Sequence, residues 1–238
     1  MAKYRIADLL VEYEPQFDRV RRNAEPYRVE TEQTPDMGLT LPEDFFECAK
    51  ECYPQLSCAD IEYGYVGQWF HCQLLDFGGS MLHASAVMMD GAAYLFTAPC
   101  GTGKSTHTTQ WVKAFGAERA QILNDDKPAV RKRDGVYYAY GTPFCGKADI
   151  SVNTCVPLGG ICILERGTQN AICRMEPKAA INFFLTQVVR SKIPERMDAL
   201  LGLLDDLLKN VPVYKMQCTV STDAAVMAYE AMRANAAE

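Results

Sequence analysis

Two apolar runs separated by a tight turn stand near the middle of the chain. Residues 81–89 and 92–97 are largely apolar, and they flank Asp90-Gly91, a dipeptide typical of two-residue hairpin turns. The second run leads directly into a glycine-rich segment, after which a helix is expected over about residues 103–115. This pattern predicts a β-hairpin, a loop and a helix in immediate succession.

Further along, short apolar runs alternate with helical stretches. Strands are expected at 122–123, 137–140, 161–164 and 213–220, and helices at about 177–191, 194–209 and 222–232. Pro177 and Pro194 open the first two of these helices, and Ser221 or Thr222 can cap the third. The alternation of strands and helices predicts the α/β class.

The first 75 residues follow a different pattern. The expected elements are a short strand at 4–13, loop or edge structure at 22–39, a helix between the capping-box sequence Thr40-Leu41-Pro42-Glu43 and Pro54, and an aromatic strand at 61–75. No Ser/Gly-rich linker separates this part from the rest. We therefore expect residues 1–75 to form a small α+β subdomain that packs on a core domain of residues 76–238.

Composition limits the classes of function. The chain has 238 residues, of which 48% are apolar and 23% charged, as in ordinary globular proteins. The net charge is −6 and the sequence has no basic stripe with interleaved aromatics, which argues against a nucleic-acid partner. The charged N-terminus is unlike a signal peptide, and the uncharged stretch 150–164 is too short to span a bilayer. We expect a cytoplasmic protein with no membrane partner, and association into a homo-oligomer stays open.

The cysteine count is high, at ten. No Cys-x-x-Cys pair is present, and Cys48 and Cys52 form a lone i, i+4 pair, so a structural zinc site is not favoured. Without an export signal, a disulfide framework is not expected either. We interpret the cysteines as buried free thiols that behave as small hydrophobic side chains in a reducing compartment.

The strongest chemical signal is the glycine-rich segment. Its pattern, Ala98-x-x-x-x-Gly103-Lys104-Ser105, has alanine where glycine usually begins the motif, and it lies between a strand and a helix, as a phosphate-binding P-loop requires. Glycines let backbone N–H groups point at phosphate oxygens, the lysine binds the β- and γ-phosphates, and the serine hydroxyl can bind Mg²⁺. The residues expected to bind the nucleotide are Ala98, Pro99, Cys100, Gly101, Thr102, Gly103, Lys104, Ser105 and Thr106.

Two adjacent carboxylates, Asp125 and Asp126, follow the short apolar run Ile122-Leu123. A P-loop needs a carboxylate at the end of a neighbouring strand for Mg²⁺, and a second carboxylate can accept a proton from an attacking hydroxyl. Adjacent carboxylates also repel each other, which raises the pKa of one unless a cation neutralises them. The alternative is an Asx turn with solvated carboxylates.

Other polar side chains near these motifs leave alternatives open. His83 lies on the apolar run before the loop strand, and it is either a buried core histidine or a functional one. His107, on the helix after the loop, is expected to be structural, and no partner is expected for His71. Lys127 and Lys147 are either contacts for phosphate or an acidic substrate, or ordinary surface lysines.

The order of these motifs resembles a known family. His83-Ala-Ser-Ala, the hairpin, the glycine-rich loop and Asn124-Asp125-Asp126 resemble the catalytic core of HPr kinase/phosphorylase, within the phosphoenolpyruvate carboxykinase-like superfamily. The chain is most similar to small forms that lack the large N-terminal domain. The resemblance implies a mixed-sheet P-loop core with C-terminal helices. It also implies that His83 and Asp125 act around the attacking hydroxyl, and that Ser105 and Asp126 serve the metal, with the two Asp roles open to exchange.

The function that this resemblance implies is an ATP- and Mg²⁺-dependent kinase. The γ-phosphoryl group would pass to a hydroxyl of a Ser or Thr in a small protein or peptide, or of a small molecule. The alternative is a nucleotide-binding regulatory or peptide-handling module with little turnover, and a hydrolase is a third candidate. Residues 140–147 stand where HPr kinase has a basic segment near its protein substrate, and they predict an ordered loop.

Overall fold

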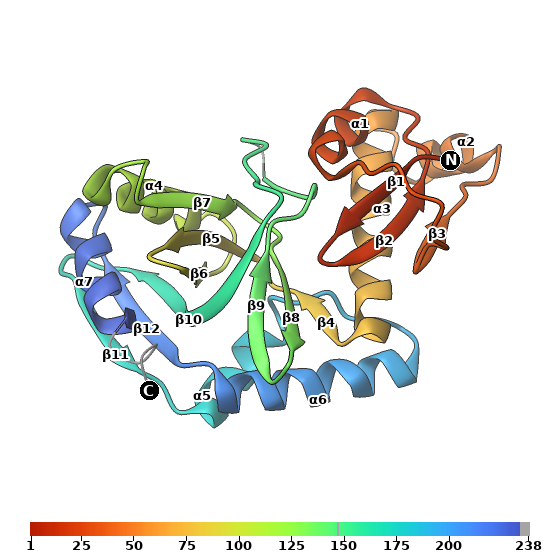
Figure 1. Ribbon diagram of the computed structural model, residues 1–238. Helices are drawn as coiled ribbons and strands as arrows, with labels where there is room; N and C mark the ends of the chain where they lie inside the picture. Colours follow the sequence, from red (N-terminus) through yellow and green to blue (C-terminus); the bar gives the residue numbers. More distant parts are fainter. Residues whose placement is uncertain (147, 234–238) are drawn as a thin grey trace.

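A computed structural model describes residues 1–146 and 148–233 of the protein, and this part of the chain forms two β-sheets surrounded by helices (Figure 1). The smaller sheet is N-terminal and contains β1 (Lys3–Ile6), β2 (Leu9–Tyr13) and β3 (Met37–Leu39). β1 and β2 pair antiparallel, and β3 joins β2 in parallel. The N-terminal helices are α1 (Asp18–Ala24), η1 (Glu25–Tyr27), α2 (Phe45–Cys52), α3 (Cys58–Leu74) and η2 (Leu75–Phe77).

The larger sheet has nine strands within the described ranges, in the order β4-β8-β9-β10-β6-β5-β7, with β12 beside β10 and β11 beside β12. Their bounds are β4 (Gly79–Met81), β5 (Ala84–Met89), β6 (Ala92–Thr97), β7 (Ala120–Asn124), β8 (Ala129–Arg133), β9 (Val136–Tyr140), β10 (Cys155–Arg166), β11 (Ala171–Arg174) and β12 (Val213–Cys218). β10 pairs antiparallel with β9 and then parallel with β6 and β12. The protein is therefore a mixed-sheet α/β protein.

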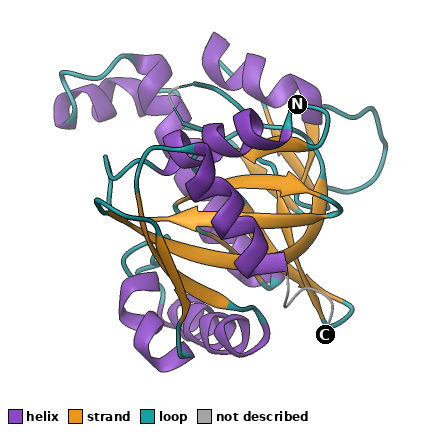
Figure 2. Cartoon of the chain, turned by 90° about the vertical axis from the view of Figure 1, so that its left-hand side faces the viewer, coloured by secondary structure: helices purple, strands orange, loops and turns teal. Residues whose placement is uncertain are grey.

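Helices cover both faces of the larger sheet, and Figure 2 shows its strands lying between them. Along β6, Ala93 and Leu95 belong to the apolar cluster formed with α5 (Pro177–Phe184) and α6 (Pro194–Asn210). Tyr94 and Phe96 belong to the cluster formed with α4 (Lys104–Phe115) and α7 (Thr222–Arg233). Because successive strand residues point to opposite faces, a strand covered on both sides is apolar throughout. This explains the continuous apolar run that precedes the glycine-rich loop.

The expected strand at 61–75 is wrong, because these residues belong to helix α3. The Ser57 side chain caps the helix by accepting a hydrogen bond from the Asp60 N–H at 3.1 Å. Buried residues then recur three or four positions apart, at Tyr63, Val66, Phe70 and Leu74, which is the period of a helix. The aromatic content of this segment had favoured a strand, but its spacing fits only a helix.

Several other boundaries differ from the sequence predictions. The helix after Pro42 begins at Phe45 with Asp44 as its N-cap and no side-chain cap bond, so the expected capping box is wrong. Helix α5 ends at Phe184, well before residue 191, and β10 is much longer than 161–164. Residues 4–13 form two strands around Ala7-Asp8, both with positive φ, a turn without the glycine that usually signals it. The hairpin, α4, α6 and α7 are confirmed.

The N-terminal elements contact the larger sheet directly. One apolar cluster joins Tyr4 and Phe70 to Tyr140 and Phe144. Polar contacts reinforce it: the Tyr140 hydroxyl donates to Asp8 at 2.6 Å, and Asp8 also pairs with Arg133 at 3.1 Å. The division of the chain into two domains at residue 75 stays a prediction.

The cysteines are all free thiols, but only Cys145 and Cys162 are buried. The interpretation as small core side chains therefore holds for these two and not for the exposed ones. None of the helices in the described ranges is long and apolar enough to cross a membrane.

Two buried histidines make the stability of the fold depend on pH. Burial lowers the pKa of His71 from 6.5 to about 3 and that of His107 from 6.5 to about 4. Between those values and 6.5 the unfolded chain binds protons that the folded chain does not. The contribution of these two neutral histidines to the free energy of unfolding is therefore fully present above pH 6.5 and decreases as the pH falls through this range. The two differ in one respect: His107 accepts a hydrogen bond from the Trp111 indole at 3.2 Å, whereas neither ring nitrogen of His71 has a partner among the described residues.

The same substitution at both histidines should therefore have opposite effects at neutral pH. His71→Leu should raise the free energy of unfolding by about 1 kcal/mol, because an unsatisfied buried polar group is removed. His107→Leu should lower it by about 1–3 kcal/mol, because the Trp111 N–H loses its acceptor. Urea unfolding at neutral and mildly acidic pH measures both effects, and His71→Leu should also show a smaller loss on acidification. A pH dependence equal to that of the wild type would contradict the assignment for His71.

Candidate functional site

The glycine-rich loop connects β6 to α4, in the strand–loop–helix setting that the sequence predicts. Gly101 and Gly103 have φ values of +78° and +121°, in the region that side-chain-bearing residues rarely adopt. Helix α4 begins at Lys104, immediately after the second of these glycines. The loop therefore delivers the N-terminal end of a helix, with its free N–H groups, to this edge of the sheet.

Lys104 is only 8% exposed and points back under the loop. Its Nζ donates to the Ala98 carbonyl oxygen at 3.2 Å and lies 3.0 Å from His83 Nε2. Burial lowers the pKa of Lys104, and the nearby charges of Asp126, Cys100 and Asp125 oppose that shift. Among the described residues no ion pair between Lys104 and a carboxylate is present, so its buried charge has no direct anionic partner there.

Asp126 approaches the same ring nitrogen of His83 as Lys104 does. Its Oδ1 is 3.3 Å from His83 Nε2, and its Oδ2 is 2.8 Å from Lys127 Nζ. Burial favours the neutral acid, but the hydrogen bond and charge of Lys127 oppose it, as does a hydrogen bond from His83 when Nε2 carries a proton, and the pKa of Asp126 is held well below its usual range. Asp126 is therefore ionised at neutral pH, and Lys127 supplies the neutralising cation.

Gln187 orients the His83 ring. The His83 backbone N–H donates to the Gln187 carbonyl oxygen at 2.7 Å, and His83 Nδ1 lies 3.1 Å from Gln187 Oε1. The Gln187 amide nitrogen donates to Thr186, which leaves the oxygen facing His83 and assigns the ring proton to Nδ1. In the neutral ring Nε2 is then an acceptor, and Lys104 is its donor. Pairing with Asp126 instead requires a proton on Nε2.

Asp125 faces a different group of side chains. It is 7% exposed, and its Oδ1 accepts a hydrogen bond from Ser85 at 2.9 Å. The Ser85 hydroxyl also lies 2.7 Å from that of Thr108, which donates to the Ser105 carbonyl oxygen at 3.1 Å. Asp125 is thus tied to the first turn of α4, where Ser105 is exposed, while Asp126 is tied to His83.

A buried side chain, Asn124, places both carboxylates. Its Oδ1 accepts hydrogen bonds from the backbone N–H groups of Asp126 at 3.0 Å and Lys127 at 2.7 Å. Its Nδ2 donates to the Thr142 carbonyl oxygen at 3.0 Å and lies 3.2 Å from the Ser151 hydroxyl. An Asx turn is therefore present, as the alternative interpretation has it, but the carboxylates that follow it are largely buried.

A cavity of about 620 Å³ adjoins the loop, lined by Pro99, Cys100, Gly101, Thr102, Ile163, Leu164, Glu165, Arg166 and Phe183. The Arg166 guanidinium donates to the carbonyl oxygens of Gly101 and Thr102, so it braces the loop from the end of β10. Neither Arg166 nor Gln187 was predicted from the sequence, because both come from distant segments and no sequence motif marks either of them.

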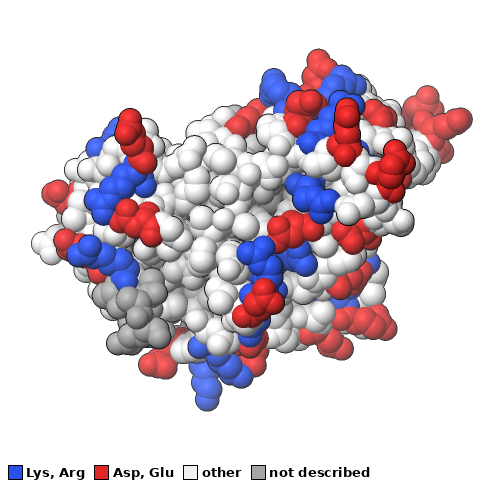
Figure 3. All heavy atoms as spheres, in the orientation of Figure 1, with Lys and Arg blue, Asp and Glu red and all other residues white. Residues whose placement is uncertain are grey.

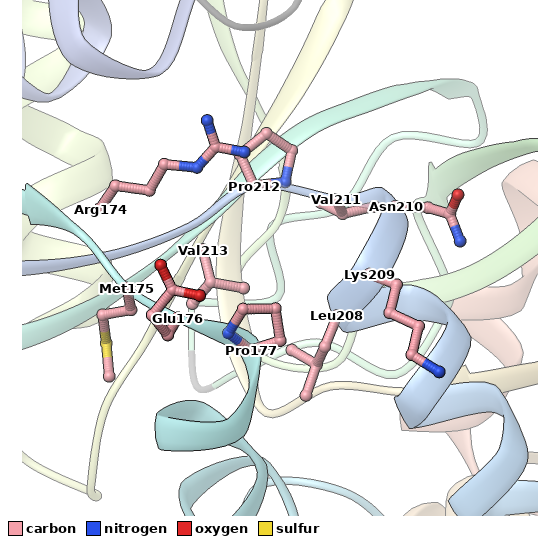
Figure 4. A pocket seen from close by; sticks show the side chains of 10 residues that line it. All are labelled: Arg174, Met175, Glu176, Pro177, Leu208, Lys209, Asn210, Val211, Pro212 and Val213. Atoms are coloured by element: carbon pink, nitrogen blue, oxygen red, sulfur yellow. The ribbon is translucent and has the colours of Figure 1, made fainter.

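A second cavity, of about 340 Å³, lies where the end of α6 meets β12 and the β11–α5 connection (Figure 4). Its lining combines Arg174, Glu176 and Lys209 with apolar residues, and it includes none of the residues predicted for the site. We therefore place the chemistry at the glycine-rich loop and not in this cavity.

Of the remaining predicted residues, only Lys127 is shown in the cluster around His83. Thr106 is exposed on α4, and His107 packs in the core below it, as expected of a structural histidine. Lys127 is engaged with Asp126, so it acts within the cluster. Lys147 lies outside the described residues.

Comparisons with known proteins add little. No protein-family model matches the chain, and no curated protein matches it either. Among solved structures the chain is similar to the Hpr(Ser) kinase/phosphatase from Coxiella burnetii, with 13% identity over 65% of this chain and 88% of that chain and a TM-score of 0.39. This is a distant structural likeness, and the chemistry of the site has to come from its own geometry.

Loss of the Asn124 side chain should disturb the site and the fold together. Asn124→Ala leaves two backbone N–H groups without their acceptor, so the free energy of unfolding should fall by on the order of 2 kcal/mol. Asn153→Ala is the matched control, because Asn153 is exposed and donates only to the Pro26 carbonyl oxygen. Denaturant unfolding measures both variants. Equal stability of Asn124→Ala and Asn153→Ala would contradict the role given to Asn124.

Proposed function

We propose that the protein is an ATP- and Mg²⁺-dependent kinase that transfers the γ-phosphoryl group to a hydroxyl group. The observation that carries this proposal is the meeting of Lys104, His83 and Asp126 within 3.0–3.3 Å, beside a glycine-rich loop at a helix N-terminus. Lys104 offers a cation to bind phosphate, and His83 with Asp126 offers a pair that can accept a proton from a hydroxyl group. These groups lie next to one another. The acceptor is a Ser or Thr of a small protein or peptide, or the hydroxyl of a small molecule.

Phosphate binding is supported by the loop and by Lys104. The backbone around Gly101 and Gly103 and the start of α4 present N–H donors, and the helix adds its positive end. Lys104 is already desolvated, so little solvent is lost when a phosphate replaces the Ala98 carbonyl oxygen and His83 as its partner. The cavity of about 620 Å³ beside the loop has the size of a pocket for the rest of a nucleotide.

The oxygens near the first turn of α4 suit Mg²⁺. Asp125 offers a carboxylate and Ser105 a hydroxyl, and Thr108 with Ser85 links the two positions. Across the described residues no group of three or more His, Cys, Asp or Glu side chains could hold a metal by itself, so phosphate oxygens and water would complete the coordination. When bound, Mg²⁺ would offset the negative charge of the phosphate oxygens. We accordingly assign the metal to Asp125 and Ser105, which exchanges the Asp roles that the family resemblance implies.

Asp126 and His83 then form the pair that takes the proton. As phosphate draws Lys104 away, His83 Nε2 loses its donor and faces Asp126 Oδ1 at 3.3 Å. The acceptor oxygen bonds to the γ-phosphorus, the bond from that phosphorus to the bridging oxygen breaks, and ADP leaves with the electron pair. The hydroxyl proton passes to the Asp126–His83 pair, in which Gln187 holds the ring.

The low pKa of Asp126 is compatible with this role. A strongly ionised carboxylate is a weak base, but phosphoryl transfer through a loose transition state needs little proton abstraction before the bond to phosphorus forms. What the site has to provide is orientation of the hydroxyl and compensation of charge. Asp126, which contacts His83 and Lys127, would orient the hydroxyl group. Lys104 would compensate the charge of the phosphates.

The lysine is tested first. Lys104→Ala should reduce Mg·ATP affinity or turnover on the order of 10²-fold, since the cation that faces the phosphates is lost. Lys113→Ala, at the exposed far end of the same helix, is the control and should behave like the wild type. Calorimetric titration and a turnover assay measure the two quantities. Wild-type affinity and turnover in Lys104→Ala would remove the basis for nucleotide binding at this loop.

The acidic pair separates a catalyst from a binding module. Asp126→Asn should keep ATP affinity but lose about 10²–10⁴-fold in phosphoryl transfer, and His83→Ala should lose less. Asp125→Asn should instead raise the Mg²⁺ concentration needed for half-maximal transfer. Asp198→Asn, on the exposed surface of α6, controls for the loss of a charge.

Transfer to candidate acceptors is measured with labelled ATP, alongside nucleotide affinity for each variant. A metal dependence that follows Asp126 would restore the roles implied by the resemblance. Tight ATP binding by the wild type without transfer to any acceptor would favour the regulatory module, and release of free phosphate would favour a hydrolase.

A further inference from the structure

Helix α2 is a short helix whose apolar side is only partly covered. None of its eight residues is buried. It contacts α3 through Phe45, whose ring lies 4.6 Å from that of Tyr65, and the start of α1 through Phe46, whose ring lies 5.1 Å from that of Phe17. An amphipathic helix normally buries its apolar stripe against the core, so this one retains apolar surface for another partner.

An open groove of about 720 Å³ lies between α2 and α3, lined by residues that include Ala49, Ile61 and Gly64. Large apolar side chains in its lining remain exposed: Tyr53 to 53%, Tyr65 to 44% and Leu56 to 39%. Apolar side chains of this size that gather around a hollow, and are not scattered singly, mark an interaction site. The volume accommodates several side chains of a partner.

The charged side chains that line this groove are acidic. They are Asp44, at the start of α2, and Asp60, on α3, and Asp60 also pairs with Arg19 at 3.0 Å. Figure 3 shows acidic side chains gathered at the upper right, the side on which α2 lies in Figure 1. An apolar groove with acidic side chains in its lining is complementary to an apolar segment flanked by Lys or Arg.

The other side of α3 reaches the loop beside the acidic pair. The Tyr63 hydroxyl accepts from the Cys145 N–H and donates to the Cys145 carbonyl oxygen, both at 2.6 Å. The next residue, Gly146, lies so close to the acidic pair that a Cβ added there would be 3.0 Å from the Asp125 carbonyl oxygen. One helix thus forms a wall of the groove and supports the loop next to the carboxylates.

We propose that the groove between α2 and α3 docks an apolar segment, flanked by Lys or Arg, of the protein or peptide that is phosphorylated. The naming of the occupant as the acceptor rests on the kinase function proposed above. The existence of the groove and its preference for a basic apolar segment do not depend on that function. Docking on α3 holds an acceptor on the helix that also contacts the site, so the phosphorylated residue lies outside the docked segment.

Binding is tested without nucleotide, which separates this proposal from the kinase function. The probe is a fluorescein-labelled helical peptide of leucine and lysine, compared with the same peptide carrying glutamate in place of lysine. Gly64→Leu fills the groove, and a Cβ at that position meets no atom within 4 Å, so the variant keeps the fold. Gly202→Leu on α6 is the matched control, because its Cβ is equally unobstructed.

The lysine peptide should bind the wild type and Gly202→Leu alike, and Gly64→Leu on the order of tenfold more weakly. The glutamate peptide should bind poorly, and Asp44→Lys, in the lining of the groove, should weaken the preference for the lysine peptide. Equal binding by Gly64→Leu and Gly202→Leu would overturn the proposal. So would a dimer in analytical ultracentrifugation that Gly64→Leu dissociates, since the groove would then bind a second copy of the chain.

The link to phosphoryl transfer is a second measurement. A serine-containing tail is added to the lysine peptide, and transfer is compared in the wild type, Gly64→Leu and Gly202→Leu. Gly64→Leu should raise KM about tenfold, and Gly202→Leu should not change it. Groove-dependent binding without any transfer would keep the docking site and overturn its assignment to the acceptor. An equal KM in all three proteins would overturn that assignment too.

Discussion

The geometry around the two carboxylates depends on one buried carboxamide, that of Asn124. It closes the turn after β7 by accepting hydrogen bonds from two backbone N–H groups, and its own amide group donates to the Thr142 carbonyl oxygen and lies within hydrogen-bond distance of the Ser151 hydroxyl. A side chain with donors on one atom and an acceptor on the other is required, because its partners are backbone N–H groups on one side and the Thr142 carbonyl oxygen and Ser151 hydroxyl on the other. Asp125 and Asp126 are directed to opposite sides as a consequence, one toward α4 and one toward His83.

Electrostatics at the site is arranged around a single ring nitrogen. His83 Nε2 lies between the cation of Lys104 and the anion of Asp126, and its protonation decides which of them it bonds. Because Lys104 is the only one of these groups that a phosphate would compete for, ligand binding and the state of the histidine are coupled without any movement of the backbone. The second cation, Lys127, keeps Asp126 charged whichever partner His83 has.

The parts of the structure that the sequence predicts are those specified by local signals. The hairpin at Asp90-Gly91, the loop before Lys104 and the helix after it follow from turn chemistry and apolar runs. Helix α3 was mispredicted, because its aromatic residues are common in strands and outweighed the helical spacing that burial against Tyr13 and Phe144, which are remote in sequence, makes plain. In the site, the motif residues were found, whereas Arg166 comes close to them through the pairing of β10 with β6, and Gln187 lies beside the isolated bridge between Leu82 and Val188.

β10 is the strand on which the larger sheet turns from antiparallel to parallel pairing. Its first residues hydrogen-bond to β9, on the side of the sheet next to the N-terminal elements, and its later residues to β6 and β12, which carry the glycine-rich loop and the C-terminal helix. Because β10 pairs with β9 on one side and with β6 and β12 on the other, loss of its pairing on one side also weakens its pairing on the other. The sheet should therefore open as one cooperative unit, with the amides of β10 exchanging their hydrogens only when the whole sheet unfolds.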